Sequence, residues 1–167
     1  MGGPARLRWF WLSLAIVAAD RATKYASESY TAEGFRRVLV PRVVTLVHTH
    51  NPGIAFGLFA DANSKWLTAT LVASTALVIA LLAWLLATGR AAGWRNQAGL
   101  ALILGGAAGN LIDRLLRGSV TDFFEVRLGS YHWPAFNVAD SAITIGAALV
   151  VLDLLLSRPH SNETRVS

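Results

Sequence analysis

The run WLTATLVASTALVIALLAWLLAT, residues 66–88, decides the fold class, because it contains no charged residue over its whole length. A helix needs about 20 mostly apolar residues to cross the hydrocarbon core of a bilayer. Two further runs of this kind cover residues 97–116 and 136–156, and a shorter one precedes Asp20. The sequence therefore predicts a membrane protein rather than a soluble domain.

The composition agrees with a membrane protein. Of the 167 residues, 54% are hydrophobic and 15% are charged, whereas about a quarter of the residues in a soluble domain are charged. The net charge of +5 is spread over loops and ends, which favours membrane lipids as partners and gives no reason to expect nucleic acid. The chain has no cysteine, which excludes a disulfide, a thiolate nucleophile and a cysteine metal site.

The N-terminal run has two interpretations. Arg6 and Arg8 before an apolar stretch are typical of a cleavable signal peptide, and the rival is a retained first helix over residues 7–26. We favour retention, because Asp20 and Lys24 belong to a motif described below.

We therefore expect an all-α membrane protein, a bundle of four transmembrane helices in a single membrane-embedded domain over residues 1–167. The expected helices cover residues 7–26, 66–88, 97–116 and 136–156. The segment 27–65 is expected outside the cytoplasm, and its β-branched stretch 37–48, broken by Pro41, predicts short strands. The polar residues 158–167 predict a disordered tail.

Four spans place both termini on one side of the membrane. The short segments on that side carry the arginines Arg6, Arg8, Arg90, Arg95, Arg158 and Arg165. By the positive-inside rule, that side is cytoplasmic. Most acidic residues fall at or near the opposite face, so most of the polar chemistry is expected at the extracytoplasmic end.

Five short polar segments gather at this end, and ionisable groups inside a bilayer are costly and usually functional. Most of them have a simple explanation when taken alone. Asp20 and Lys24 share a helix face and suit an exposed ion pair worth less than about 1 kcal/mol. Gly105 and Gly109 suit close helix packing. The five segments are 20–24, 51–57, 105–114, 118–124 and 136–143.

Three aspartates are candidates for chemistry by position: Asp113, Asp122 and Asp140. Two carboxylates held close cannot both ionise cheaply, so one keeps a proton while the other activates water, as in aspartic proteases. Asp113 precedes Arg114 and lies one turn from Asn110, which suits a structural carboxylate. Asp122 precedes two phenylalanines, and such surroundings raise the pKa of a carboxyl.

The motifs Asp20-Arg-Ala-Thr-Lys24, Asn51-Pro-Gly-Ile-Ala-Phe56, Gly105-Gly-Ala-Ala-Gly-Asn-Leu-Ile-Asp-Arg114, Gly118-Ser-Val-Thr-Asp-Phe123 and Phe136-Asn-Val-Ala-Asp-Ser141 resemble those of the lipoprotein signal peptidases (signal peptidase II). The order, the spacing and the four-span layout match over nearly the whole chain. Two departures are Ile54 and Thr121, which stand where the family more often has alanine and an aliphatic residue.

The resemblance implies a peptidase of the bacterial cytoplasmic (inner) membrane. It implies cleavage of diacylglyceryl-modified prolipoproteins before the lipid-bearing cysteine, with Asp122 and Asp140 as the catalytic pair and a small extracytoplasmic sheet lying on the membrane. The supporting residues that it implies are Asp20, Lys24, Asn51, Gly53, Asn110, Asp113, Arg114 and Asn137. We expect no cofactor or metal and a monomeric protein.

Three rival functions differ in class. An ion transporter would place carboxylates deeper in the spans, where only Asp153 comes close, near the inner end. A metalloprotease could use His48, His50 and His132, but the sequence has no His-Glu-x-x-His motif. A purely structural membrane protein would not need five polar segments at one face.

Overall fold

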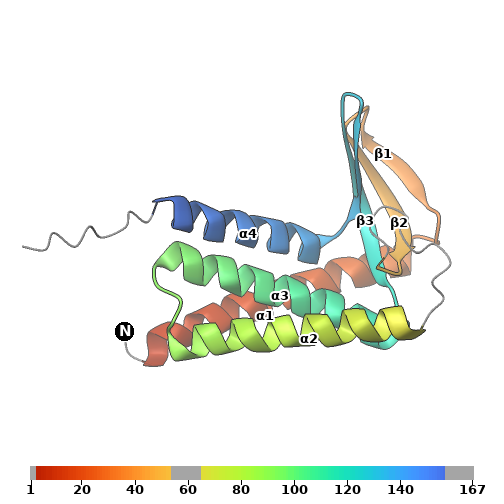
Figure 1. Ribbon diagram of the computed structural model, residues 1–167. Coiled ribbons are helices and arrows are strands. Elements are labelled where there is room, and N and C mark those ends of the chain that lie inside the picture. Colours follow the sequence, from red (N-terminus) through yellow and green to blue (C-terminus); the bar gives the residue numbers. More distant parts are fainter. Residues whose placement is uncertain (1–2, 54–64, 157–167) are drawn as a thin grey trace, which may run out of the picture.

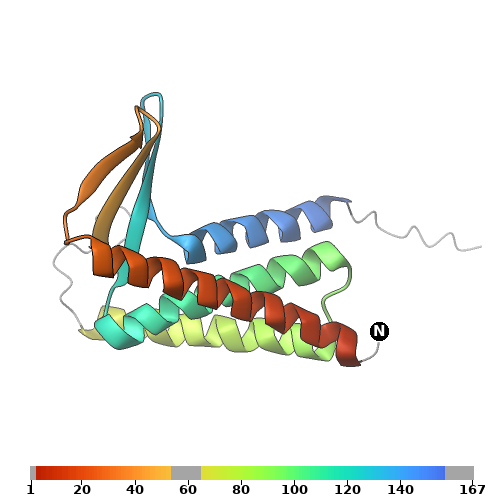
Figure 2. The same cartoon turned by 180° about the vertical axis from the view of Figure 1, so that it is seen from behind.

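The computed structural model describes residues 3–53 and 65–156, and its four helices run side by side with a sheet standing across one end (Figure 1). The helices are α1 (Gly3–Tyr30), α2 (Lys65–Thr88), α3 (Trp94–Arg117) and α4 (Val138–Leu156). Seen from behind, α1 begins and α4 ends at the end of the bundle away from the sheet (Figure 2). The expected four-helix bundle is confirmed.

Two helix bounds differ from expectation in a way that matters for the site. α1 continues to Tyr30 rather than ending at residue 26, so Glu28 is helical. α4 begins at Val138 rather than at residue 136. The tail predicted over residues 158–167 and the family departure at Ile54 lie outside the described residues.

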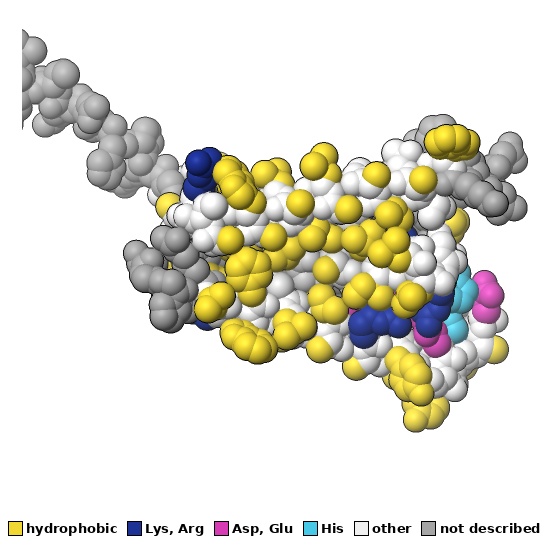
Figure 3. All heavy atoms as spheres, turned by 90° about the horizontal axis from the view of Figure 1, so that it is seen from below, with side chains coloured by type: hydrophobic (Ala, Val, Ile, Leu, Met, Phe, Trp, Pro, Cys, Tyr) yellow, Lys and Arg dark blue, Asp and Glu magenta, His cyan; other side chains and the backbone are white. Residues whose placement is uncertain are grey.

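Three helices of the described chain are long and apolar enough to cross a membrane: α2, α3 and α4. α1 is longer, but its second half carries Asp20, Arg21 and Lys24. Large hydrophobic side chains such as Leu77 and Leu155 lie exposed on the helices. Hydrophobic side chains cover most of the visible bundle surface, and charged ones gather mainly near the sheet (Figure 3). Such an apolar surface is expected of a protein that crosses the membrane several times.

α3 is the central helix and contacts each of the other three. Its glycines make the close approaches possible. A Cβ atom on Gly105 would lie 2.7 Å from the Ser13 carbonyl oxygen of α1, and one on Gly106 would lie 2.4 Å from the Ala139 carbonyl oxygen of α4. Closer to the start of α3, Gly99 packs against Gly146 of α4 in the same way. The glycines therefore set how closely α1 and α4 approach α3.

The sheet is larger than the sequence predicted. Its four antiparallel strands lie in chain order, β1 (Arg36–Val40), β2 (Val44–Asn51), β3 (Val120–Leu128) and β4 (Tyr131–Phe136). The sequence predicted strands only in the stretch 37–48, before α2, and none in the connection between α3 and α4. That connection forms a hairpin instead, because Gly129 takes a left-handed φ of 61° at its turn and Pro134 lies in the edge strand β4, where proline is tolerated.

Candidate active site

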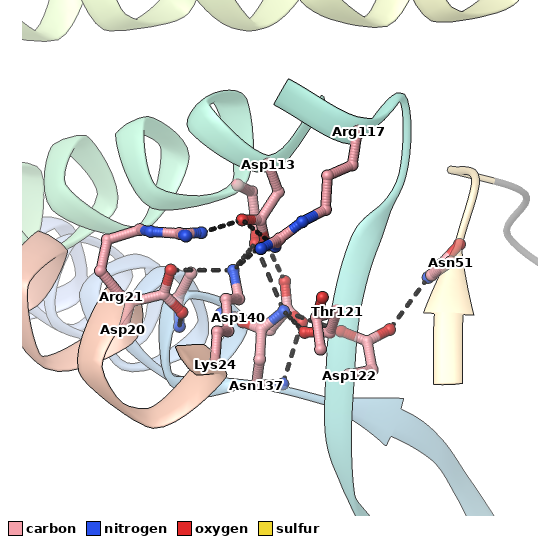
Figure 4. Close-up of polar contacts among 12 residues, drawn as sticks. Asp20, Arg21, Lys24, Asn51, Asp113, Arg117, Thr121, Asp122, Asn137 and Asp140 are labelled. Carbon is pink, nitrogen blue, oxygen red and sulfur yellow. Dashed lines mark hydrogen bonds and ion pairs between the residues drawn. The ribbon is translucent and has the colours of Figure 1, made fainter. Parts of the chain in front are cut away.

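The site lies where α1, α3 and α4 reach the sheet, and a buried lysine stands at its centre (Figure 4). Lys24 Nζ lies 2.8 Å from Asp20 Oδ2, 2.8 Å from Asp113 Oδ2 and 3.0 Å from Asn110 Oδ1. The side chains of Lys24, Asp20 and Asp113 are all 0% exposed. The exposed ion pair considered for Asp20 and Lys24 is therefore wrong: the helix periodicity is right, but both residues face α3 instead of water.

Asp20 also joins the first helix to the last. Its Oδ1 accepts a hydrogen bond of 3.0 Å from the backbone N–H of Ala139 in the first turn of α4. That N–H has no partner inside its own helix. One carboxylate thus neutralises Lys24 and completes the N-terminus of α4.

Asp113 takes its cations from α1 rather than from its chain neighbour. It forms ion pairs with Lys24 and Arg21, and Arg117 lies 3.8 Å from its Oδ1. Arg114 interacts electrostatically with Asp140, Asp113 and Asp122, and its Nε is buried without a hydrogen-bond partner among the described residues. Asp113 is thus enclosed by positive charge.

Asp122 and Asp140 are linked by one amide side chain. Asn137 Nδ2 donates to Asp122 Oδ1 at 2.7 Å, while Asn137 Oδ1 accepts from the Asp140 backbone N–H at 2.9 Å. Asp140 Oδ2 in turn accepts from the Asn137 backbone N–H at 3.2 Å. This reciprocal pattern is a capping box at the start of α4, and it explains why the helix begins at Val138.

Two more amides complete the surroundings of the pair. Asn110 Nδ2 donates to Asp140 Oδ1 at 2.8 Å, and Asn51 Nδ2 donates to Asp122 Oδ2 at 3.2 Å. Gly53 fixes Asn51, since its N–H donates to Asn51 Oδ1 at 2.9 Å and its φ of 95° suits glycine. All ten residues expected at the site therefore lie in it or next to it.

The two carboxyls of the pair differ in how deeply they are buried. Asp122 is 2% exposed, whereas Asp140 is half-buried. Burial raises the pKa of Asp122 to about 7, and the nearby Asp140 charge adds to this rise, while the hydrogen bonds from Asn51 and Asn137 oppose it. One carboxyl of the pair can thus hold a proton near neutral pH.

An apolar cavity of about 320 Å³ opens beside Asp140, between the sheet and α4. Its walls come from both strands of the hairpin and from one side of α4; they include Val126, Leu128, Trp133, Phe136, Thr144 and Ile145. The site thus has a polar centre and an apolar approach.

His48 and His132, two of the histidines considered as metal ligands, make contacts with other side chains. The His48 ring lies 3.0 Å from Thr31 Oγ1, and His132 pairs with Glu125. Among residues 3–53 and 65–156, no group of three or more His, Asp and Glu side chains is arranged to hold a metal ion.

Four residues that the sequence analysis did not select also join the site: Arg21, Glu28, Arg117 and Thr121. Glu28 forms an ion pair with Arg117 and accepts a hydrogen bond of 2.9 Å from Thr121 Oγ1. The signal for Glu28 was the spacing of four between Asp20, Lys24 and Glu28, which places them on one helix face once α1 is continued to Tyr30.

The chain is similar in sequence to one family of known proteins. The sequence profile of a family described as "Signal peptidase (SPase) II" matches residues 12–156. A lipoprotein signal peptidase of Solibacter usitatus is 39% identical over 163 residues, which is 96% of this chain and 98% of that protein. One of Pseudomonas putida is 41% identical over 156 residues, which is 92% of this chain and 90% of that protein.

A solved structure is similar throughout. A bacterial membrane enzyme determined by the in meso method at 2.3 Å resolution superposes with a TM-score of 0.81 at 27% sequence identity. The match covers 96% of this chain and 94% of that one.

Proposed function

The chain belongs to the signal peptidase II family of membrane aspartic peptidases, and on this premise we propose that Asp122 and Asp140 are its catalytic pair. The observation that supports the assignment is the single amide of Asn137 that bonds both residues. Asp113, the third candidate, is enclosed by Lys24 and Arg21 and has a structural role.

The proposed chemistry is hydrolysis with one shared proton. With its pKa raised to about 7, Asp122 holds the proton, and Asp140 accepts a proton from the attacking water. Asp122 then donates its proton to the carbonyl oxygen of the scissile bond, which gives a gem-diol. As the C–N bond breaks, Asp140 passes the proton taken from water to the leaving amine, and Asp122 takes a proton back from one hydroxyl of the gem-diol, which becomes the new carboxyl group. The pair ends with the same number of protons as it began.

The remaining polar residues position the pair. Asn110 and Asn137 hold Asp140, and Asn51, fixed by Gly53, holds Asp122. Lys24 holds Asn110 in turn. The other supporting residues act through the charge that they place around this centre; they are Asp20, Asp113 and Arg114.

The proposed substrates are diacylglyceryl-modified prolipoproteins, cut before the lipidated cysteine. The relatives compared above are lipoprotein signal peptidases, and the apolar cavity beside Asp140 suits an apolar part of such a substrate. We propose that the enzyme acts as a monomer, in one membrane-embedded domain, with no metal or other cofactor.

The proposed location is the bacterial cytoplasmic membrane, with the site near its extracytoplasmic face. Three arginine side chains lie over tryptophan rings at the end of the bundle away from the sheet, namely Arg8 over Trp9, Arg90 over Trp84 and Arg95 over Trp94. Arginine in short segments is typical of the cytoplasmic side, and tryptophan marks a membrane interface on either side. The sheet end, with the aspartate pair, then faces outward.

The decisive experiment incubates the purified full chain in detergent with a lipidated prolipoprotein and follows the shortened product by mass spectrometry. We expect a cut directly before the lipid-bearing cysteine. The same precursor without its diacylglyceryl group serves as the matched control and should stay intact. No cleavage of the lipidated precursor, or a cut at another bond, would contradict the proposal.

A further inference from the structure

We propose that Thr121 and Glu28 form a positioning link that holds strand β3 against α1 and so places Asp122 opposite Asp140. This inference rests on the proposed function, since it concerns the same pair.

The link begins at a fully buried hydroxyl. Thr121 is 0% exposed, and its Oγ1 donates to Glu28 Oε1 at 2.9 Å. Successive side chains of a strand point to opposite faces. Thr121 therefore points towards the helices, and Asp122 points the other way, towards Asn51 (Figure 4).

The backbone transmits this anchor to Asp122. The Thr121 carbonyl oxygen accepts from Asn137 Nδ2 at 3.3 Å, and the same nitrogen donates to Asp122 Oδ1 at 2.7 Å. A shift of Thr121 would thus disturb both bonds that Asn137 makes to β3. In the register of the sheet, Thr121 pairs with His50 and Asp122 with Thr49, close to a bulge in β2, where the ladder alone holds the strand less firmly.

Glu28 is itself held by α3. It forms an ion pair with Arg117, and Arg117 lies 3.8 Å from Asp113. From Asp113 the polar contacts continue through Lys24 and Asn110 to Asp140. The two members of the pair are therefore joined by two routes, a short one through Asn137 and a long one through the Thr121–Glu28 link.

An aliphatic residue at 121 would break the long route directly and would disturb the short one only through a shift of the backbone. Valine has nearly the shape of threonine but lacks the hydroxyl, so it removes the bond to Glu28. A small displacement of a reacting group lowers the rate strongly. A slacker strand would also admit water around Asp122.

The test uses the full chain in detergent with a lipidated prolipoprotein. Thr121→Val and Glu28→Ala should each lower kcat about tenfold and leave KM within about twofold, and the double variant should be no worse than the slower single variant. Thr121→Ser keeps the hydroxyl and should therefore have a kcat close to that of the wild type. The controls are Thr70→Val and Glu33→Ala, since Thr70 bonds only its own helix at Trp66 and both residues are exposed.

A titration separates positioning from a general loss of folded protein. The charged groups that face Asp122 are Asp140 from α4, Lys24 from α1 and Arg114 from α3, and none is changed. More water around Asp122 should lower its raised pKa, so the alkaline limb of kcat/KM should move to lower pH. Infrared titration of the Asp122 carboxyl measures the same shift without any substrate.

Three results would overturn the link: an unchanged kcat in Thr121→Val, additive losses in the double variant, or an Asp122 titration that does not move. If Thr121→Val does not fold, Glu28→Ala and Thr121→Ser carry the same comparison. A wild-type chain that cleaves no prolipoprotein would contradict the proposed function instead, and the infrared titration would still decide on the link.

Discussion

The side-chain amide of Asn137 donates to the buried carboxyl of Asp122 over 2.7 Å. The same residue is the N-cap of α4 and exchanges hydrogen bonds with Asp140. A helix cap thus doubles as the bridge between the two carboxyls, so the geometry of the pair follows from the way in which one helix begins.

The first prediction concerns the pair. Asp122→Asn and Asp140→Asn should each abolish turnover, because an amide keeps the shape of the side chain but cannot carry the proton. Both variants should still fold and bind substrate, as checked by thermal unfolding and by co-purification with an uncleaved lipidated precursor. Asp113→Asn should mainly lower stability or expression. Near-normal cleavage by either of the first two variants, at equal protein level, would refute the pair.

The second prediction concerns pH. A carboxyl ordinarily titrates near pH 4, and burial together with Asp140 raises the pKa of Asp122 to about 7. Asp122 is protonated below that value, so kcat/KM should be high below pH 7 and fall as the pH rises through it. The hydrogen bond from Asn51 opposes the rise, and Asn51→Leu should therefore move the alkaline limb to higher pH.

The direction of that shift is the decisive readout. Asn51→Leu raises the apparent pKa, whereas Thr121→Val should lower it. A pH profile that is flat between pH 6 and 8 in the wild type would show that Asp122 does not carry the essential proton.

The third prediction concerns the buried lysine. Lys24→Met removes the charge and keeps most of the volume, which leaves Asp20 and Asp113 buried without their shared cation. Breaking such a pair costs about 3–5 kcal/mol, so thermal unfolding in detergent should occur at a clearly lower temperature. Arg127→Met, an equivalent change at an exposed position of β3, is the control and should unfold like the wild type.

The fourth prediction separates helix packing from the site. Gly99→Ala and Gly106→Ala both place a Cβ atom against a backbone carbonyl oxygen of α4, at 2.6 Å and 2.4 Å respectively. Both should destabilise the protein by forcing α3 and α4 apart. Only Gly106 contacts Ala139, next to Asp140, so only Gly106→Ala should also lower kcat per folded molecule. Equal activity losses in the two variants would contradict this distinction.

The fifth prediction concerns topology. Both termini should be cytoplasmic and residues 27–65 outside, because arginines gather in the short segments at the other end. A phosphatase reporter that is active only outside the cytoplasm should be active when fused at Asn63 and inactive when fused at Arg158. The opposite result would place the site on the wrong side for lipoprotein processing.

The apolar runs made the helices predictable, and spacing within helices made most site residues predictable. The hairpin of β3 and β4 was not predicted, because Gly118, Gly129 and Pro134 suggested a loop and outweighed the β-forming residues between them. Glu28 was missed because the charged second half of α1 resembles the end of a span. The burial of Lys24 could not be predicted, since its partners Asn110 and Asp113 are distant in sequence and meet it only in the folded bundle.

The hydrogen bond from Ala139 to Asp20 joins α1 to α4, which are the first and last of the described helices in chain order. Asn137 and Asp140 also belong to the start of that last helix. Both aspartates of the pair, and the amide that bridges them, follow α3 in the chain, so α1, α2 and α3 alone cannot form the pair. On the proposed chemistry, the chain therefore gains proteolytic competence only once α4 has joined the bundle.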